Sequence, residues 1–293
     1  MIAAEAPASS ANLGPAFDTA AVALDLWNRA EIGEGAFAVE LDGEGADELP
    51  RDASHLSIRA FAVFASPDRY RFRFTNCIPL ERGLGSSAAA IALGLVAGAA
   101  AAGRDVRDDE LLAAARRFEN HLDNLAAAIL GGVCASWEAD GEPRARRLAD
   151  DMPAAAIAVV PNARTSTVAS RTALPAHVPH ADAAASAGAA LLLGAAVVSG
   201  DAALLEPALR DRLHEPYRAH GAPLLEAVRR HAPADALGVT LSGSGPSVIV
   251  WVPRGREEAV AARLESSLGA GVAVRRLAVA STGARATAAE TGT

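Results

Sequence analysis

A short segment rich in glycine and serine has the residue types that hold anions. It reads Pro79-Leu80-Glu81-Arg82-Gly83-Leu84-Gly85-Ser86-Ser87-Ala88-Ala89 and leads into an alanine-rich stretch that favours a helix. Glycines let backbone N–H groups approach a ligand closely, and a helix N-terminus adds unpaired N–H groups and the positive end of a dipole. The segment therefore predicts an anion site.

Three interpretations of this segment compete. The simplest is a flexible turn followed by a helix that Ser86 or Ser87 caps. Gly83, Gly85 and Ala88 also have the spacing of a dinucleotide-binding fingerprint, but no strand directly precedes them and another helix is expected next. The third interpretation is a phosphate cradle made of backbone amides and serine hydroxyls, with one hydroxyl free to reach Mg²⁺.

The sequence contains no lysine, since all 27 basic residues are arginine. This excludes the phosphate-binding lysine of a P-loop, the strand lysine of protein kinases and the Schiff-base lysine of pyridoxal enzymes. Phosphate chemistry here would depend on backbone amides, metal and arginine. The two cysteines, Cys77 and Cys134, lack ligand-spaced partners, and we expect both to be buried small residues.

Length and charge exclude further classes of protein. A chain of 293 residues with 51% hydrophobic residues is expected to form two packed cores or one elongated unit. The net charge is −8 and no basic run occurs, so we expect no nucleic-acid partner. No apolar stretch reaches the roughly 20 residues that span a bilayer, and no secretory signal is recognisable, so we expect a cytoplasmic protein without a membrane partner.

The elements that position the glycine-serine segment follow from apolar periodicity and from helix start and stop signals. Helices are expected at residues 86–102, 108–119 and 122–130. Strands are expected at residues 37–41, 69–74, 133–138 and 154–160. A polar stretch at 138–147 breaks the pattern, and we place a domain boundary near Leu148, which divides the chain into residues 1–148 and 149–293.

The second half alternates helices with strands and predicts an α+β layer. Helices are expected at residues 182–198, 202–209, 222–230 and 257–268. Strands are expected at residues 239–241, 247–252 and 272–277. The last ten residues, 284–293, are small and polar and are expected to be frayed.

Three segments, in order, resemble the signature motifs of one superfamily. The glycine-serine segment is similar to the second motif of the GHMP kinases, which include galactokinase, homoserine kinase and mevalonate kinase. Residues 6–18 (APASSANLGPAFD) resemble the first motif, and residues 241–247 (LSGSGPS) resemble the third. The resemblance implies an α+β, two-domain GHMP kinase fold: an N-terminal domain of the ribosomal protein S5 domain 2 type and a ferredoxin-like C-terminal domain, with the active site between them.

Within the superfamily, residues 6–18 most resemble the homoserine kinases. Three further segments agree with that branch: residues 121–124 with two glycines after them, residues 166–171, and residues 211–218. The resemblance implies ATP and Mg²⁺ as cofactors, L-homoserine as the acceptor of the γ-phosphate, a role in threonine biosynthesis, and a homodimer. Homoserine carries an ammonium, a carboxylate and a primary alcohol, so its site needs an acid, arginine and a polar cradle.

The resemblance assigns site residues one by one. The nucleotide contacts are Pro79, Arg82, Gly83, Leu84, Gly85, Ser86, Ser87, Ala88, Ala89, Gly243, Ser244 and Gly245. The amino-acid pocket consists of Asn12, Asp18, His121, Asn124, Thr167, Arg171 and Arg218. The Mg²⁺ ligands are Ser87 and Glu119.

The catalytic candidates are Ser87, Glu119, Asp123 and Asn124. Asn124 matches the position at which some superfamily members place an aspartate base. The neighbouring Asp123 stays a candidate base, because a shift of one residue in the alignment would give it that role. His121 belongs with the substrate contacts, since phosphoryl transfer depends chiefly on positioning and charge stabilisation.

Two departures from the motifs lie beside the amino-acid pocket. Ala16 and Asn120 stand where glycine is usual, and alanine at a position with φ > 0 would cost on the order of 1 kcal/mol or more. Two alternative functions therefore stay open: a kinase of this family for another small hydroxy-amino acid or hydroxy metabolite, and a non-catalytic nucleotide or metabolite sensor.

Overall fold

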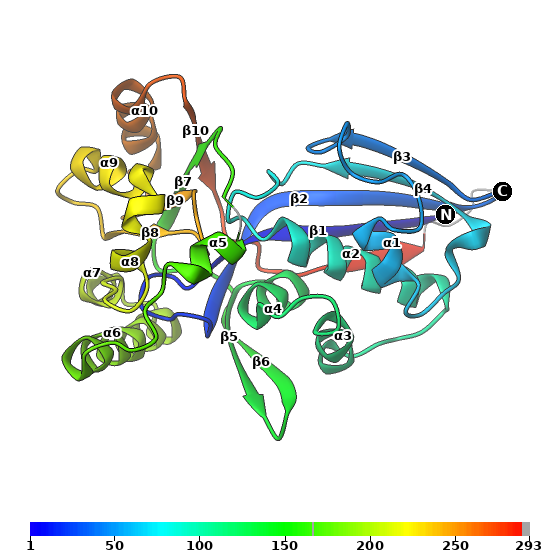
Figure 1. Cartoon of the computed structure of the whole chain (residues 1–293), viewed down its shortest axis with the longest axis horizontal. Coiled ribbons are helices and arrows are strands. Elements are labelled where there is room, and N and C mark those ends of the chain that lie inside the picture. Colours follow the sequence, from blue (N-terminus) through cyan, green and yellow to red (C-terminus); the bar gives the residue numbers. More distant parts are fainter. Residues whose placement is uncertain (166, 289–293) are drawn as a thin grey trace.

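The structure, a computed structural model, describes residues 1–165 and 167–288, with the side chains of 167–169 and 288 left out. Figure 1 shows two parts that lie side by side, each built on one β-sheet. The first sheet and its helices contain both termini of the described chain, and the second sheet lies at the other end of the long axis.

The first sheet has seven strands. They are β1 (Ile2–Ala11), β2 (Ala20–Glu34), β3 (Ala38–Gly43), β4 (Tyr70–Asn76), β5 (Val133–Ala139), β6 (Glu142–Ala149) and β11 (Arg285–Ala288). Their order is β11-β1-β2-β4-β3, with β5 paired to β2 and β6, and only the β3–β4 pairing is parallel. The sheet leaves one face for helices to cover.

Four helices pack with this sheet: α1 (Leu56–Phe61), α2 (Ser86–Ala101), α3 (Asp108–Ala115) and α4 (Leu122–Leu130). The central helix α2 is buried along most of its length, because apart from two serines and two glycines all its residues are alanine, leucine, isoleucine or valine. Two glycines let α1 pack against it closely, since a Cβ on Gly94 would lie 2.1 Å from the Ser57 carbonyl oxygen and one on Gly98 2.4 Å from that of Phe61. The N-terminus of α2 is thereby held firmly above β1.

The second sheet has the strand order β10-β7-β9-β8, all antiparallel. Its strands are β7 (Ala155–Pro161), β8 (Gly238–Leu241), β9 (Val248–Val252) and β10 (Val272–Leu277). Alternate residues of β7 and β9 belong to two different apolar clusters: Ile157 and Val250 pack with α9 (Pro223–His231) and α10 (Glu257–Leu268), whereas Ala158 and Trp251 pack with the core of the first domain. Burial on both faces explains the unbroken apolar runs in these strands.

The remaining helices join β7 to β8. They are α5 (Thr167–Thr172), α6 (His180–Ser199), α7 (Leu205–Ala208) and α8 (Glu215–Arg218), with short 3-10 turns before α7 and after α8. The helical and strand segments that link β7, β8, β9, α10 and β10 in this order form the split βαβ arrangement of a ferredoxin-like domain. The two-domain architecture expected from the motifs is confirmed.

Several elements differ from the sequence-based expectations. The polar stretch at 138–147 is a β-hairpin of β5 and β6, and not a break, since its strands are largely exposed and so lack apolar alternation. The helix expected at 108–119 ends at Ala115, and the one expected at 202–209 is divided into a 3-10 turn and α7. The strands β1 and β2 and helix α1 were not anticipated.

The chain does not divide cleanly at residue 148. The two sheets change over between β6 and β7, close to the expected boundary near Leu148, which stays a proposal. However, β11 pairs antiparallel with β1, with Arg285 opposite Glu5, so this strand belongs to the first sheet. Residues 285–288 are therefore ordered by strand pairing, whereas the expectation of fraying for 289–293 falls outside the described residues.

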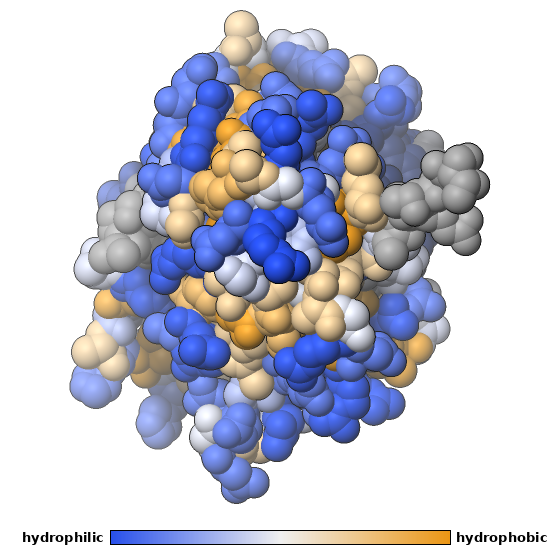
Figure 2. Space-filling model, turned by 90° about the vertical axis from the view of Figure 1, so that its right-hand side faces the viewer, coloured by the Kyte–Doolittle hydropathy of each residue, from blue (hydrophilic) through white to orange (hydrophobic). Residues whose placement is uncertain are grey.

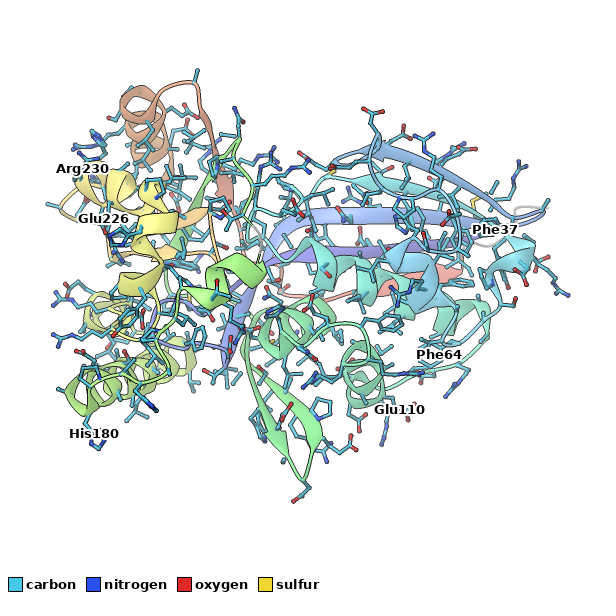
Figure 3. All side chains as sticks on the ribbon, viewed as in Figure 1. Phe37, Phe64, Glu110, His180, Glu226 and Arg230 are labelled. Carbon is cyan, nitrogen blue, oxygen red and sulfur yellow. The ribbon has the colours of Figure 1, made fainter. Side chains whose placement is uncertain are left out.

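The surface carries apolar residues at both ends of the molecule. Figure 2 views the end at which the two termini lie, where hydrophobic residues gather near the centre among hydrophilic ones, and Figure 3 places Phe37 at this end. At the other end, α6 is long and apolar enough to cross a membrane, contrary to the expectation that no segment reaches that length. One such helix is weak evidence for a membrane span, although Leu191 and Val198 are 76% and 67% exposed.

Charged residues lie on the exposed faces of α3 and α9. Figure 3 shows Glu226 and Arg230 on α9 and Glu110 on α3 directed away from the ribbon. Glu110 lies near two arginines, at 3.8 Å from Arg104 and 3.5 Å from Arg107. Such exposed pairs contribute little to stability.

Of the two cysteines, Cys134 is buried and Cys77 is partly exposed, with both thiols free. Burial raises the pKa of the Cys134 thiol to about 12. The expectation of buried small residues is confirmed for Cys134, whereas Cys77 is only partly buried.

Candidate active site

A cavity of about 170 Å³ lies where the three sequence motifs meet. It is lined by the end of β1, the start of α2, the turn before α4, and residues of α4, α5, α8 and the loop after β8. Its lining residues are Ala11, Asn12, Asp18, Glu81, Gly83, Gly85, Ser86, Ser87, Ala88, Glu119, His121, Asp123, Asn124, Arg171, Arg218, Gly243 and Ser244.

The glycine-serine loop needs its glycines. Gly83 and Gly85 have φ of 74° and 68°, in the left-handed region that L side chains rarely adopt. A Cβ on Gly83 would lie 2.3 Å from the Ser242 carbonyl oxygen, and one on Gly85 would lie 2.0 Å from the Ser9 hydroxyl. Gly85 is also the N-cap of α2, so the unpaired amides of that helix open into the cavity. The geometry is that of an anion cradle.

Hydrogen bonds connect this loop to the other two motifs. The Ser242 hydroxyl donates to the Gly83 carbonyl at 2.7 Å and lies 2.9 Å from the Ser10 hydroxyl. The Asn12 side-chain amide donates to the Gly243 carbonyl at 2.9 Å, and the Gly243 N–H donates to the Ala11 carbonyl at 3.1 Å. Segments more than 200 residues apart therefore form one rigid floor.

Glu119 lies at the loop side of the cavity, where its carboxylate hydrogen-bonds the Ser87 hydroxyl and the ring Nδ1 of His121. Burial by itself raises the pKa of Glu119, but the bonds from His121 and Ser87 outweigh it, so the pKa is lowered and the group stays ionised. The bond to Glu119 raises the pKa of His121. A carboxylate beside a hydroxyl at a phosphate loop suits Mg²⁺, which takes oxygen ligands and completes its shell with phosphate and water.

Asp123 and Asn124 are on the first turn of α4. Asp123 is 2% exposed, and burial raises the pKa of its carboxyl to about 6. The Asn124 Oδ1 accepts a hydrogen bond from the Ser9 hydroxyl at 2.9 Å, and its Nδ2 faces Asp123 Oδ1 at 3.5 Å. These contacts fix the orientation of the Asn124 amide at the wall of the cavity.

Three charged groups lie on the opposite side of the cavity. Arg171 donates two hydrogen bonds to Asp18, at 2.9 and 3.0 Å, and both Arg171 and Arg218 lie over the ring of Phe17. Arg218 is only 5% exposed, and its Nε is a buried donor without a partner among the described residues. Arg218 lines the cavity, and a mostly buried guanidinium at a cavity wall favours an anionic ligand.

A second hollow of about 310 Å³ adjoins the first and shares Glu81, Ser86 and Ser87 with it. It is lined by apolar and uncharged polar groups together with three charged residues, Glu48, Glu81 and Arg164. His55 is buried there against the ring of Phe74, and burial lowers its pKa to about 4, which keeps the imidazole neutral. The hollow offers a mostly uncharged compartment next to the anion cradle.

Most residues that the sequence singled out do meet at the cavity. Five of the expected nucleotide contacts do not line it: Pro79, Arg82, Leu84, Ala89 and Gly245. The Arg82 guanidinium instead donates to the carbonyls of Leu80, Pro161 and Asn162, and so ties the loop to the second domain. The backbone of Thr167 begins α5, but its side chain lies outside the described residues.

Sequence reasoning missed several residues of the site. Ala11 and Glu81 line the cavity, Ser9 holds Asn124, and Phe17 and His214 pack beneath the arginines. All five fall within motif segments whose other members were assigned, so position inside a motif was the only signal available. Ala16 and Asn120 do not have positive φ, so neither residue carries the backbone strain that a replaced glycine could have caused.

Comparison with known proteins agrees with this geometry. The family of GHMP kinases N terminal domains matches residues 54–132, and the GHMP kinases C terminal family matches residues 189–270. The chain is 40% identical to a homoserine kinase of Corynebacterium aurimucosum over 87% of this chain and 88% of the relative, and 38% identical to that of Streptomyces avermitilis over 95% and 93%.

A solved structure shares the whole fold. The homoserine kinase of Cytophaga hutchinsonii superposes with a TM-score of 0.85 at 24% identity and covers 98% of this chain and 97% of the other. That identity is low enough that the superposition speaks for the fold alone. With two family domains, closely related sequences and a cavity where all three motifs meet, the chain belongs to the GHMP kinase family, among its homoserine kinases.

Proposed function

We propose that this enzyme transfers the γ-phosphate of ATP to the side-chain hydroxyl of L-homoserine and yields O-phospho-L-homoserine for threonine biosynthesis. One observation carries the proposal: a single cavity of about 170 Å³ is lined by an anion cradle and by the acid and two arginines that an amino acid requires. The relatives at 38 to 40% identity support the same substrate.

ATP is proposed to place its phosphates against the loop amides and the hydroxyls of Ser86 and Ser87, with Ser244 on the opposite side. The adjoining hollow, next to the same two serines, is the space for the nucleoside. Glu119 and Ser87 would hold Mg²⁺, which when bound neutralises charge on the phosphates. Because lysine is absent, no ammonium group of the chain shares this task.

The amino acid is proposed to bind on the far side of the cavity. Asp18 and Asn12 receive the ammonium, and Arg171 and Arg218, which both line the cavity, receive the carboxylate. In the free protein Asp18 and Arg171 neutralise each other, so the zwitterion exchanges one ion pair for two. His121, which lines the cavity, and Thr167, at the start of α5, are the remaining proposed contacts of this pocket.

The reaction is proposed as in-line attack by the homoserine hydroxyl oxygen on the γ-phosphorus. A new O–P bond forms, the bond to the β,γ-bridging oxygen breaks, and ADP leaves with that electron pair. Asn124 orients the hydroxyl, and the loop amides at the N-terminus of α2 stabilise charge on the equatorial oxygens. No side chain is needed as a dedicated base, and the hydroxyl proton is lost to solvent or to the phosphoryl oxygens.

The test is turnover in a coupled ADP assay with L-homoserine, L-serine, L-threonine and mevalonate, with mass spectrometry of the product. Homoserine is expected to be the preferred acceptor and to gain one phosphate on its side-chain oxygen. Preference for another hydroxy compound would transfer the proposal to that substrate. Nucleotide binding without turnover on any acceptor would indicate a sensor.

Two coarser expectations complete the proposal. We place the enzyme in the cytoplasm, as expected of a soluble metabolic enzyme, and we propose a homodimer, as the family resemblance implies. Light scattering at micromolar concentration distinguishes a dimer of about twice 29.8 kDa from a monomer.

A further inference from the structure

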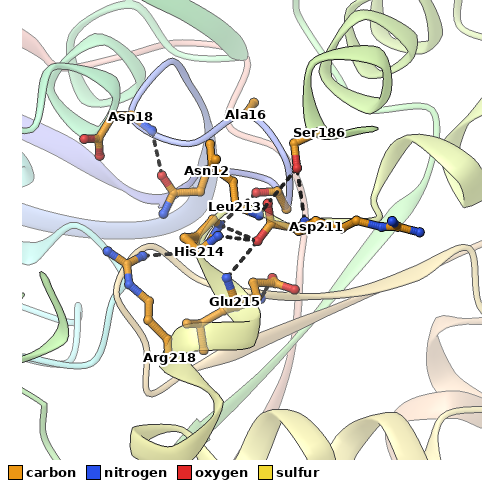
Figure 4. Close-up of polar contacts among 12 residues, drawn as sticks. Asn12, Ala16, Asp18, Ser186, Asp211, Leu213, His214, Glu215 and Arg218 are labelled. Atoms are coloured by element: carbon orange, nitrogen blue, oxygen red, sulfur yellow. Dashed lines mark hydrogen bonds and ion pairs between the residues drawn. The ribbon is translucent and has the colours of Figure 1, made fainter. Parts of the chain in front are cut away.

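One buried histidine lies between the two halves of the amino-acid pocket and was assigned no role. His214 is 0% exposed and precedes α8, the short helix that carries Arg218. Its ring Nε2 lies 2.8 Å from the carbonyl oxygen of Gly14, 200 residues away in the chain. Its Nδ1 lies 3.0 Å from Nη1 of Arg218. Figure 4 shows the ring among Asn12, Asp211 and Arg218.

The two partners decide how the ring is protonated. An arginine has only N–H donors, so His214 Nδ1 must accept from Arg218. A carbonyl only accepts, so Nε2 must carry the proton and donate to Gly14. The ring is therefore a neutral Nε2–H tautomer, and burial, which lowers the pKa of His214, acts in the same direction. A doubly protonated ring could still donate from Nε2 to Gly14, but its Nδ1 could no longer accept the hydrogen bond from Arg218.

The ring is fixed from its other sides as well. The backbone N–H of His214 donates to Asp211 Oδ2 at 2.8 Å, and the same carboxylate oxygen accepts the backbone N–H of Glu215 at 2.7 Å. One face stacks on Phe17 with ring centroids 5.2 Å apart, and Phe17 in turn lies under Arg218. His214 therefore has little freedom to rotate.

The His214 ring connects two parts of the proposed amino-acid pocket, the turn at Gly14 and Arg218. Gly14 belongs to the turn that bears Asn12 and Asp18, and the Asn12 Oδ1 accepts the N–H of Asp18 at 3.0 Å. Asn12 and Arg218 also share the Gly243 carbonyl as an acceptor, at 2.9 and 3.3 Å. The Gly14 backbone packs closely against Leu209, since a Cβ on Gly14 would lie 2.7 Å from the Leu209 carbonyl oxygen. This close packing limits movement of the turn. His214 is the side chain that bonds this turn to the arginine directly.

We propose that His214 is a positioning residue that sets the separation between the ammonium-binding turn at Asp18 and the carboxylate-binding Arg218, and thereby the affinity of the enzyme for its amino acid. This inference rests on the proposed function for the identity of the amino acid. It predicts that loss of the bridge changes the KM for homoserine and leaves the nucleotide loop, on the other side of the cavity, unaffected.

Three substitutions separate the two bonds. His214→Asn retains an acceptor near the Nδ1 position, His214→Gln retains a donor near the Nε2 position, and His214→Phe retains the stacking on Phe17 but neither bond. His214→Phe is expected to raise the KM for homoserine by at least about 10-fold, with the other two variants between it and wild type and the KM for ATP changed less than about 2-fold. The control is His220→Phe, an exposed histidine two residues after Arg218.

The outcomes are distinct. Equal changes in both KM values, or a lowered melting temperature with unchanged kinetic constants, would overturn the proposal in favour of a purely structural role. If His214→Phe does not fold, the Asn and Gln variants decide by the same split. Independently, ¹⁵N NMR of wild type at pH 7 is expected to show a neutral Nε2–H tautomer, and a charged or Nδ1–H ring would refute the bridge. If wild type does not phosphorylate homoserine, the proposed function fails, while the tautomer still tests the bridge.

Discussion

We propose that the cavity has two sides that recognise ligands in different ways. The proposed nucleotide side consists mainly of one segment, residues 83–88, which presents backbone amides at the start of α2, and the loop with Gly243 and Ser244 completes it. The amino-acid side consists of side chains at Asp18, His121, Arg171 and Arg218, which come from distant segments. The first depends on backbone shape, so it should fail when a Cβ is added at Gly83 or Gly85, where neighbouring atoms lie within 2.3 Å of the added atom. The second depends on charge and hydrogen-bond geometry.

A second difference concerns how each side is satisfied without ligand. On the amino-acid side, Asp18 and Arg171 pair with each other. On the nucleotide side, the helix N-terminus has no acidic residue in its first turn, so its amides remain available for an anion. The comparison implies that nucleotide recognition is ready before binding, whereas amino-acid recognition requires an exchange of ion pairs.

The largest effect is expected where the two sides meet the metal. Glu119→Gln keeps the shape but removes the charge that we propose for Mg²⁺, which contributes several kcal/mol to such reactions. We expect kcat to fall by about 10³-fold and the Mg²⁺ concentration for half-maximal rate to rise. Steady-state kinetics over a Mg²⁺ series measure both. Glu110→Gln on the surface is the control, and an unchanged Mg²⁺ dependence would remove Glu119 from the metal site.

A smaller loss is expected from one methyl group on the loop. Gly85→Ala places a Cβ 2.0 Å from the Ser9 hydroxyl and 3.2 Å from Asn124 Oδ1, at a φ of 68°. Displacement of these groups is expected to lower kcat/KM by about 10²-fold. Gly103→Ala is the matched control, because its φ is 62° with no atom within 4 Å of the added Cβ. Equal activity in both variants would contradict backbone shape as the basis of nucleotide recognition.

The amino-acid side should respond to geometry even when charge is kept. Arg218→Lys preserves the positive charge but cannot bond His214 and the Gly243 carbonyl as a guanidinium does. We expect the KM for homoserine to rise about 30-fold, which corresponds to roughly 2 kcal/mol, with the KM for ATP nearly constant. The control is Arg230→Lys on the outer surface of α9. If the KM for homoserine and the KM for ATP rose equally, the proposal that the two sides of the cavity recognise different ligands would be wrong.

The smallest effect on rate is expected at Asp123. If no dedicated base is needed, Asp123→Asn lowers kcat less than about tenfold, whereas a base would cost at least about 10²-fold. A fall beyond that range would make Asp123 the base and the reaction one of general base catalysis. Turnover at saturating substrates decides between them, and Asp105→Asn on the surface is the control.

The Asp123→Asn variant also tests the burial of this carboxyl, through the pH dependence of the free energy of unfolding. Burial raises the folded-state pKa of Asp123 from 3.8 to about 6, so its contribution to stability is complete below about pH 4 and is lost as pH rises through 6. Wild type should therefore lose up to about 3 kcal/mol between pH 4 and pH 8 that Asp123→Asn retains. Urea unfolding at both pH values measures the difference. Parallel curves would show that the carboxyl is not buried in an apolar surrounding.

The sequence alone was sufficient wherever the relevant interactions are local. The glycine-serine loop, the helices α2, α4 and α10 and the strands β7, β9 and β10 were anticipated closely, since turn chemistry and apolar periodicity act over a few residues. The order of the three motifs indicated one superfamily of kinases, and the absence of lysine excluded the phosphate-binding classes that require one.

Tertiary structure decided the rest, because those features depend on partners far along the chain. Strand β1 is rich in alanine and serine, which have weak strand preference, and pairing with β2 and β11 imposes its conformation. The Asp18–Arg171 pair and the His214 bridge join residues 153 and 200 positions apart. Arg82 likewise donates to the carbonyls of Pro161 and Asn162 in the other domain, a contact between residues about 80 positions apart that its place in the motif does not reveal. Spacing along a sequence contains no information about such contacts, which only the packing of the two domains creates.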